Sequence, residues 1–331
     1  MKVVVLLLSV CIGALSCVTV SEDNTPPAIT KEMPVQERFD VALKFGGASL
    51  KNVKKVTTIE KQWPEMAKVA RTYLRNNVRS AEREEIIRAA QIYQSSVPAL
   101  EPKVLQIFTR HPSQEISVIG WQLAALRPSE ELKTFIEEEV SYFVMRGKET
   151  RILMPELASA IMENEVHSVY SVLELGLSEN KGDDFAKAMI ALNPDAAAGS
   201  FMDYLNIATI EDLRQMNQTT VDVYTCLVIL RFFMNNPLPL GHQGISQLFA
   251  YAVSRNSALS DMAREVIDRQ VPSYKEAMTF ALASLPMRVQ IAFVEGSRRN
   301  PSSNYRLLLS HLRQVTRYHQ VIEEIDAIKI F

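Results

Sequence analysis

Residues 111–136, HPSQEISVIGWQLAALRPSEELKTFI, carry the pattern that decides the fold. Apolar residues recur at three- and four-residue spacing on both sides of Pro128-Ser129, which is the period of an amphipathic α-helix. A proline disfavours helical conformation in the residue before it, and serine is a good N-cap. The stretch therefore predicts two helices joined by a short corner at Pro128-Ser129.

The same layout returns in residues 258–280, ALSDMAREVIDRQVPSYKEAMTF, with a second Pro-Ser corner at Pro272-Ser273. Further helical stripes are Ile86, Ile87, Ala90 and Tyr93; Leu132, Phe135, Ile136, Val140 and Phe143; and Tyr305, Leu308, Leu312, Val315, Ile322 and Ile325. No convincing run of alternating strand residues interrupts them. We expect an all-α chain, with the last stripe, which ends at Phe331, forming a C-terminal capping helix.

Prolines, glycines and serines punctuate these stripes. The residues expected at corners or helix starts are Pro112, Pro128, Pro194, Pro237 and Pro301; Gly147, Gly182, Gly241 and Gly296; and the N-cap serines Ser80, Ser113 and Ser129. Each cap serine has a glutamate in the following turn, where a negative charge suits the helix dipole.

Both Pro-Ser segments resemble HEAT-like repeats, in which a first helix rich in small residues packs on a second helix. The resemblance is specific in these two places and loose elsewhere. It implies an α-solenoid of stacked helix pairs, because one pair cannot bury its apolar face alone. Tetratricopeptide repeats are less favoured, since their Trp/Leu-Gly/Tyr spacing over 34 residues is not seen.

The N-terminus carries the strongest targeting signal. Lys2 is followed by the apolar run 3–15 and by Ser16-Cys17, which is the composition of a secretory signal peptide. The run is too short to span a bilayer, which takes about 20 residues. Ala14-Leu15-Ser16-Cys17 resembles the lipobox of bacterial lipoproteins, although that family prefers Leu where Ala14 stands. The resemblance implies that Cys17 is diacylated and becomes the first mature residue. An ordinary A-x-A-like cut that releases a soluble protein is the alternative.

These signals divide the chain into three parts. Residues 1–16 are the expected signal peptide, and 17–35 the lipidated N-terminus and a flexible tether of polar, proline-bearing composition. Residues 36–331 are the expected α-helical repeat domain. Without residues 1–16 the chain has 35 basic and 38 acidic residues, a net charge of −3, which argues against a nucleic-acid binder. Cys226, the only cysteine of the body, is expected to be a buried small hydrophobe.

One segment is similar to a nucleotide site. Lys44-Phe-Gly-Gly-Ala-Ser49 resembles the phosphate-binding opening of aspartate kinases, in which backbone amides and a lysine can hold phosphate. That family needs a parallel α/β sheet, whereas this chain offers helices. We therefore expect Gly46-Gly47 to be a break between helices and expect no nucleotide to bind there.

Other chemistry-bearing residues do not converge. The five histidines, His111, His167, His242, His311 and His319, lack metal-ligand spacing. His242 lies in Gly241-His-Gln-Gly244 and is expected in a structural loop. Glu137, Glu138 and Glu139 are expected on a solvated helix face, because adjacent helical residues point in different directions. Asn217-Gln-Thr219 matches a glycosylation triplet that arises often by chance. We predict no catalytic, cofactor or metal residue; the lipidation residue is Cys17.

Charge is segregated along the chain. Residues 51–90 hold ten basic and five acidic residues, whereas 129–225 hold seven basic and eighteen acidic residues, a net of −11. Segregated charge can steer a partner of complementary charge. The sequence thus favours a membrane-anchored, non-enzymatic scaffold of the bacterial envelope that faces the periplasm and binds an unknown protein. The alternative is an all-α envelope enzyme, for instance one acting on peptidoglycan, with one acidic catalyst in a helical cleft.

Overall fold

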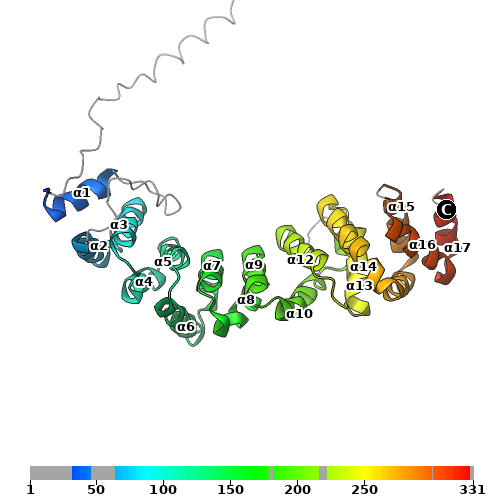
Figure 1. Ribbon diagram of the computed structural model, residues 1–331, viewed down its shortest axis with the longest axis horizontal. Coiled ribbons are helices and arrows are strands. Elements are labelled where there is room, and N and C mark those ends of the chain that lie inside the picture. Colours follow the sequence, from blue (N-terminus) through cyan, green and yellow to red (C-terminus); the bar gives the residue numbers. More distant parts are fainter. Residues whose placement is uncertain (1–31, 46–63, 179–181, 216–221, 300, 329–331) are drawn as a thin grey trace, which may run out of the picture. The chain divides into compact units, whose positions relative to one another are not determined.

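The computed structural model of the protein describes residues 32–45, 64–178, 182–215, 222–299 and 301–328. The described residues form helices joined by short connections, with no β-strand among them, so the all-α prediction is confirmed for this part of the chain (Figure 1). They divide into two compact units, one up to Pro98 and the other from Ala99, and each unit is described by itself.

The first unit contains three mutually contacting helices: α1 (Val35–Phe45), α2 (Pro64–Asn77) and α3 (Arg83–Ser96). Phe39 of α1 is completely buried, and its ring centroid lies 5.3 Å from that of Tyr73 in α2. The Tyr73 hydroxyl donates a hydrogen bond of 2.9 Å to Glu85 of α3. Burial and this bond to a carboxylate raise the pKa of Tyr73 to about 12. The three helices are therefore held by one aromatic core with a polar edge.

The second unit contains the remaining helices. Their bounds are α4 (Pro102–Thr109), α5 (Gln114–Leu126), α6 (Glu130–Val144), η2 (Glu149–Arg151), α7 (Pro155–Glu163), η3 (His167–Val169), α8 (Tyr170–Leu177), α9 (Asp183–Leu192), α10 (Pro194–Leu205), α11 (Ile210–Gln215), α12 (Val223–Asn235), α13 (His242–Ala252), α14 (Ser257–Ser284), α15 (Met287–Arg299), α16 (Ser303–Val315) and α17 (His319–Ala327).

Many helices of this unit contact the next helix but one along the chain, which gives two series of contacts. One series of contacts runs α5–α7–α9–α12–α14–α16, and Figure 1 shows α5, α7, α9 and α12 standing side by side. A second series includes α11–α13, α13–α15 and α15–α17. The pair α13/α14 links the two series, and α4/α5 and α8/α9 are further contacts between helices that follow one another in the chain. The core is therefore spread along the unit, with fully buried side chains such as Phe108, Phe201 and Phe293 in successive parts of it.

The predicted corners before α5, α6, α10 and α16 and after α12 all fall between helices. At the Pro128-Ser129 corner the Ser129 hydroxyl accepts a hydrogen bond of 3.3 Å from the Leu132 amide and caps α6 as predicted. Asn164, only 1% exposed, braces this corner from α7. It accepts from the Ser129 amide and donates to the carbonyls of Ala124 and Ala160. Ser113 precedes α5 without a side-chain cap bond, and Ser80 is not a cap, because α3 begins at Arg83.

Several predicted boundaries differ from the observed ones, among them those at Pro272 and in the C-terminal stripe. The predicted Pro272-Ser273 corner is a kink rather than a loop: two helical segments, together labelled α14, meet there, with non-helical backbone angles at Tyr274. Proline removes one helix hydrogen bond and clashes with a preceding carbonyl, and a kink accommodates both effects without a loop. The C-terminal stripe is two helices, α16 and α17, rather than one, and Val315 at the end of α16 is 55% exposed. No described helix combines the length and the apolar character needed to cross a bilayer.

Candidate interaction site

A groove with a volume of about 420 Å³ lies between the C-terminal half of α14 and helix α16. Its apolar wall includes Phe280 and Ala283 of α14 and Val315 of α16. Glu276, Ser284 and His311 supply its polar groups. Apolar walls with a few polar groups are the usual composition of a binding site.

Phe280 is the most unusual residue of this groove, because 68% of its surface is exposed. The two helices do not need it for packing, since Met278 and Leu282 of α14 and Leu308 of α16 are already completely buried. Contiguous exposed apolar side chains mark interaction sites in soluble proteins. Phe280 and Val315 together therefore form the apolar part of a candidate contact surface, which we call the α14/α16 groove.

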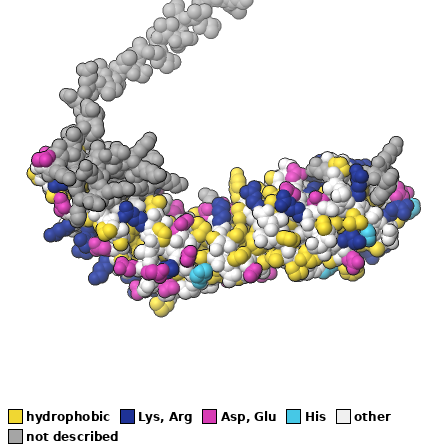
Figure 2. Space-filling model, viewed as in Figure 1, with side chains coloured by type: hydrophobic (Ala, Val, Ile, Leu, Met, Phe, Trp, Pro, Cys, Tyr) yellow, Lys and Arg dark blue, Asp and Glu magenta, His cyan; other side chains and the backbone are white. Residues whose placement is uncertain are grey.

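His242 extends this surface onto α13. His242 had been predicted to lie in a loop, but it is the first residue of α13. Its ring centroid lies 5.4 Å from that of Phe280. On the other wall, His311 Nδ1 lies 2.9 Å from the Leu307 carbonyl oxygen. In the view of Figure 2, hydrophobic side chains interleave with charged ones over the part of the chain that α13 and α14 occupy in Figure 1.

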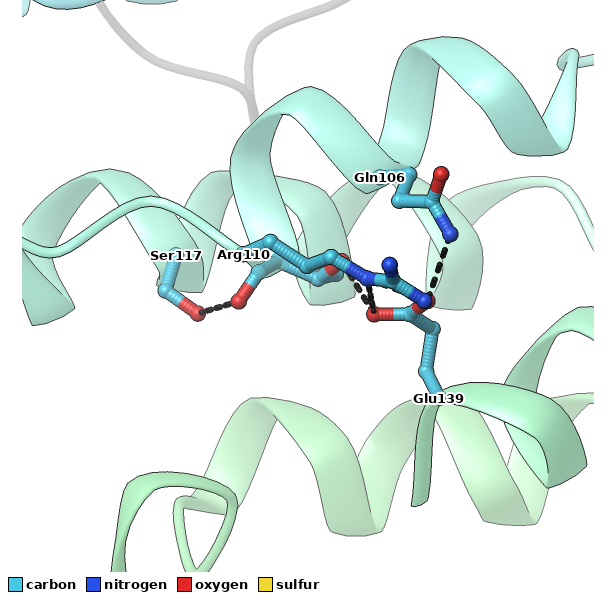
Figure 3. A network of polar contacts seen from close by, with 5 residues as sticks. Gln106, Arg110, Ser117 and Glu139 are labelled. Atoms are coloured by element: carbon cyan, nitrogen blue, oxygen red, sulfur yellow. Dashed lines mark hydrogen bonds and ion pairs between the residues drawn. The ribbon is translucent and has the colours of Figure 1, made fainter. Parts of the chain in front are cut away.

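A second polar assembly joins α4 to α6 around Glu139, whose side chain is only 1% exposed (Figure 3). The Glu139 carboxylate accepts hydrogen bonds from Gln106 Nε2 at 2.8 Å and from Thr109 Oγ1 at 3.1 Å. Arg110 donates through Nε at 3.0 and 3.2 Å and through Nη2 at 2.6 Å. Ser117 of α5 donates to the Thr109 carbonyl and ties the third helix to this assembly.

Arg110 completes the assembly on its solvent side. Its guanidinium carbon lies 3.8 Å from the ring centroid of Tyr142, and the guanidinium carbon of Arg146 lies 4.4 Å from that same centroid. The bond to Glu139 raises the pKa of Arg110 above its ordinary value. Donors that surround a carboxylate in this way replace the water it loses on burial.

The prediction of a solvated glutamate triplet is therefore wrong for Glu139. The 100° turn per residue of α6 leaves Glu138 exposed and Glu137 half-buried, with Glu137 accepting from Ser168, but carries Glu139 inward. The hydrogen bonds and positive charge of Arg110, 29 residues earlier, compensate the loss of water around the buried carboxylate. Glu139 does not fit the single acidic catalyst of the alternative hypothesis, because both of its carboxylate oxygens already accept hydrogen bonds from protein side chains.

Other predicted residues divide between confirmed positions and positions outside the described part. Cys226 is completely buried, as predicted, and its sulfur lies 3.5 Å from the Tyr251 hydroxyl. Burial raises the pKa of the Cys226 thiol to about 12. Cys17, Asn217 and the segment from Gly46 to Ser49 lie outside the described residues, and their predictions remain predictions.

Within the described ranges, no three His, Cys, Asp or Glu side chains are placed to share a metal ion. No protein family, curated protein or solved structure matches this chain. The functional argument therefore rests on its own residues.

The sequence analysis did not identify the α14/α16 groove. A signal was present, because Phe280 lies off the buried positions Met278, Ala281 and Leu282 of its own helix. A large apolar residue outside the buried stripe of its helix indicates an exposed apolar surface, which is typical of an interaction site.

Proposed function

We propose that this chain is a lipoprotein of the bacterial envelope, anchored to a membrane through acylated Cys17, and that it serves as a non-enzymatic scaffold for a partner protein. The repeat body would be a solenoid of HEAT-like helix pairs. Residues 18–35 would act as a tether that lets the body stand away from the membrane, facing the periplasm.

The solenoid proposal is supported by the order of helix contacts in the second unit. Helices of each series contact the next member of the series, and the pair α13/α14 connects the two series. In a solenoid each repeat touches only its neighbours, which leaves long faces free for a partner. That these helix pairs are HEAT-like repeats is a further part of the proposal.

The observation that carries the scaffold function is the exposure of Phe280 beside Val315 in the α14/α16 groove. Aromatic anchors in such positions contribute a large share of binding energy at protein interfaces. The partner that fits presents an apolar side chain to Phe280 and a hydrogen-bond donor or a cation to Glu276. A helix with one apolar face meets these requirements.

Photo-crosslinking in cells tests the groove. Replacing Phe280 by a photoreactive phenylalanine analogue should give one discrete adduct after irradiation. The matched control is Tyr224 of α12, an aromatic residue that is 73% exposed and lies outside the groove. Absence of any adduct at position 280, or equal yields of the same adducts at both positions, would refute the groove as the contact site.

The anchor is tested separately. Metabolic labelling with a fatty-acid analogue should mark the protein, and Cys17→Ala should remove the label and release the protein from membranes. An unlabelled protein found wholly in the soluble fraction would instead support the ordinary secretory cut. Because Cys226 is buried, Cys226→Ala is the control that should keep the label.

The acidic stretch 129–225 gives a kinetic test once a partner is identified. Glu139 must be left intact because it is structural, so we would neutralise exposed carboxylates such as Glu138 and Glu131. Steering by charge acts before contact, so association should slow and lose its salt dependence while dissociation stays unchanged. Association that is insensitive both to these changes and to salt would show a merely solvated surface.

A further inference from the structure

Arg264 is a buried cation at the side of a small cavity. Its side chain comes from the N-terminal half of α14, and the residue is only 7% exposed. The cavity has a volume of about 160 Å³ and lies between α14, the end of α13 and helix α15. Its other charged lining residues are Arg299, Asp261 and Glu295, all of them on the exposed side.

Arg264 is poorly compensated for a buried charge. Within the described part of the chain it donates two long hydrogen bonds, to the carbonyl oxygens of Phe293 at 3.4 Å and Ala292 at 3.5 Å. An ordinary N–H···O bond measures about 2.9 Å, and a charged donor usually makes a shorter one. No carboxylate among the described residues lies within ion-pair distance of Arg264, although its guanidinium carbon lies 5.1 Å from the Phe293 ring centroid. Burial lowers the pKa of Arg264, which reflects the same missing compensation.

Helix α15 is shaped around this guanidinium. A Cβ atom on Gly296 would stand 2.0 Å from Arg264 Nη2, so only glycine leaves room for the side chain in its present position. Gly296 had been predicted between helices, but it lies inside α15, where glycine is unfavourable. Arg299, three residues later, lies on the same face of α15 and brings a second guanidinium to the cavity.

We propose that this cavity, the Arg264 pocket, binds a carboxylate, with Arg264 and Arg299 as its charged partners. The guanidinium fork matches the two oxygens of a carboxylate. The cavity is large enough for a carboxylate and one small substituent. A phosphate dianion carries twice the charge against Asp261 and Glu295 at the rim, so these side chains oppose it more strongly than a carboxylate.

NMR titration of the full-length protein, observed at the arginine side-chain Nε–Hε signals, tests the site. The probes are N-acetylalanine, which imitates the end of a protein chain, its amide, which lacks the carboxylate, acetate and inorganic phosphate. N-Acetylalanine should shift the Arg264 signal with saturation, and the amide should not. Tighter binding of N-acetylalanine than of acetate would indicate a chain terminus as the natural ligand, and equal binding would indicate a free small carboxylate.

Three variants guard against an indirect effect. Arg299→Gln should fold normally and weaken N-acetylalanine about tenfold, the loss expected for one charge-assisted hydrogen bond. Gly296→Ala should displace the guanidinium and abolish binding. Arg306→Gln on α16 removes an exposed arginine outside the pocket and should leave binding unchanged. The proposal is overturned if no carboxylate binds, if phosphate binds more tightly than both carboxylates, or if Arg299→Gln binds like Arg306→Gln. This test does not depend on the α14/α16 groove or on Cys17.

Discussion

Glu139 and Arg264 are both buried charges in the second unit, yet their surroundings are opposite. Glu139 accepts hydrogen bonds from three side chains, one of them a guanidinium with an N–O distance of 2.6 Å. Arg264 has two backbone contacts of 3.4 and 3.5 Å and no carboxylate partner among the described residues. A buried charge with all its partners in place belongs to the architecture. A buried charge that lacks them, beside an open cavity, indicates a place for a ligand.

The structural role of the Glu139 charge is tested by Glu139→Gln, which keeps the side-chain volume and removes the charge. We expect the free energy of unfolding to fall by about 2–3 kcal/mol, because charge-assisted bonds are lost in a dry site and an amide can accept from fewer donors. Arg110 is partly exposed and can turn to water, which limits the loss. Urea unfolding measures it.

The control for that experiment is the neighbouring Glu138→Gln. Glu138 is exposed, and its replacement should change stability by no more than about 0.5 kcal/mol. Equal midpoints for the two variants would show that the Glu139 carboxylate adds nothing to the α4–α6 contact.

Asn164 is a buried neutral side chain, and the stability it contributes can be compared with that of the buried charges. Asn164→Ala removes three hydrogen bonds at the Pro128-Ser129 corner, and we expect a loss of about 2 kcal/mol. Asn236 also stands at a corner, before Pro237, but its side chain makes one bond, to the Phe232 carbonyl. Asn236→Ala should therefore cost less than 1 kcal/mol. Thermal and urea unfolding of the pair would contradict this account if both variants lost the same amount.

Much of the fold was predictable because its determinants are local. Helical spacing and the chemistry of proline corners can be recognised within a few residues, and the corners at Pro112, Pro128, Pro194 and Pro237 followed from them. Pro272 shows the limit, since helical spacing and a proline predict a corner but not whether it is a loop or, as in α14, a kink with non-helical angles at Tyr274.

The charged sites were not predictable in the same way. In sequence Glu139 is one member of an acidic triplet, and its partner Arg110 belongs to a different helix. Arg264 resembles any surface arginine until Gly296, 32 residues later, is placed against it. Burial of a charge depends on which helices meet, and spacing within one helix contains no such information.

Cys226 is a buried group that is neutral in the folded protein, in contrast to Glu139 and Arg264. Its thiol pKa is raised to about 12 in the folded protein, from an ordinary value of 9.0. Its contribution to stability is therefore complete below pH 9 and decreases as the unfolded thiol ionises above it. Between pH 8 and 10 we expect a loss of about 1.4 kcal/mol from this group. Urea unfolding under reducing conditions should show the loss, and Cys226→Ala should remove most of it. An unchanged pH dependence in that variant would assign the loss to other groups.

The smallest effect should come from Arg264→Met. Methionine keeps most of the buried stem and removes a charge whose desolvation is poorly compensated, so stability should change by less than about 1 kcal/mol in either direction. The bond from the Tyr305 hydroxyl to the Arg264 carbonyl is made by the backbone and survives the change. Urea unfolding beside Glu139→Gln makes the comparison direct. A loss as large as that of Glu139→Gln would mean that Arg264, too, is architectural, and that its long contacts are sufficient for it. A near-neutral result means that the fold does not need this cation, so a buried guanidinium beside a cavity, with room left for it at Gly296 of α15, requires a reason outside stability.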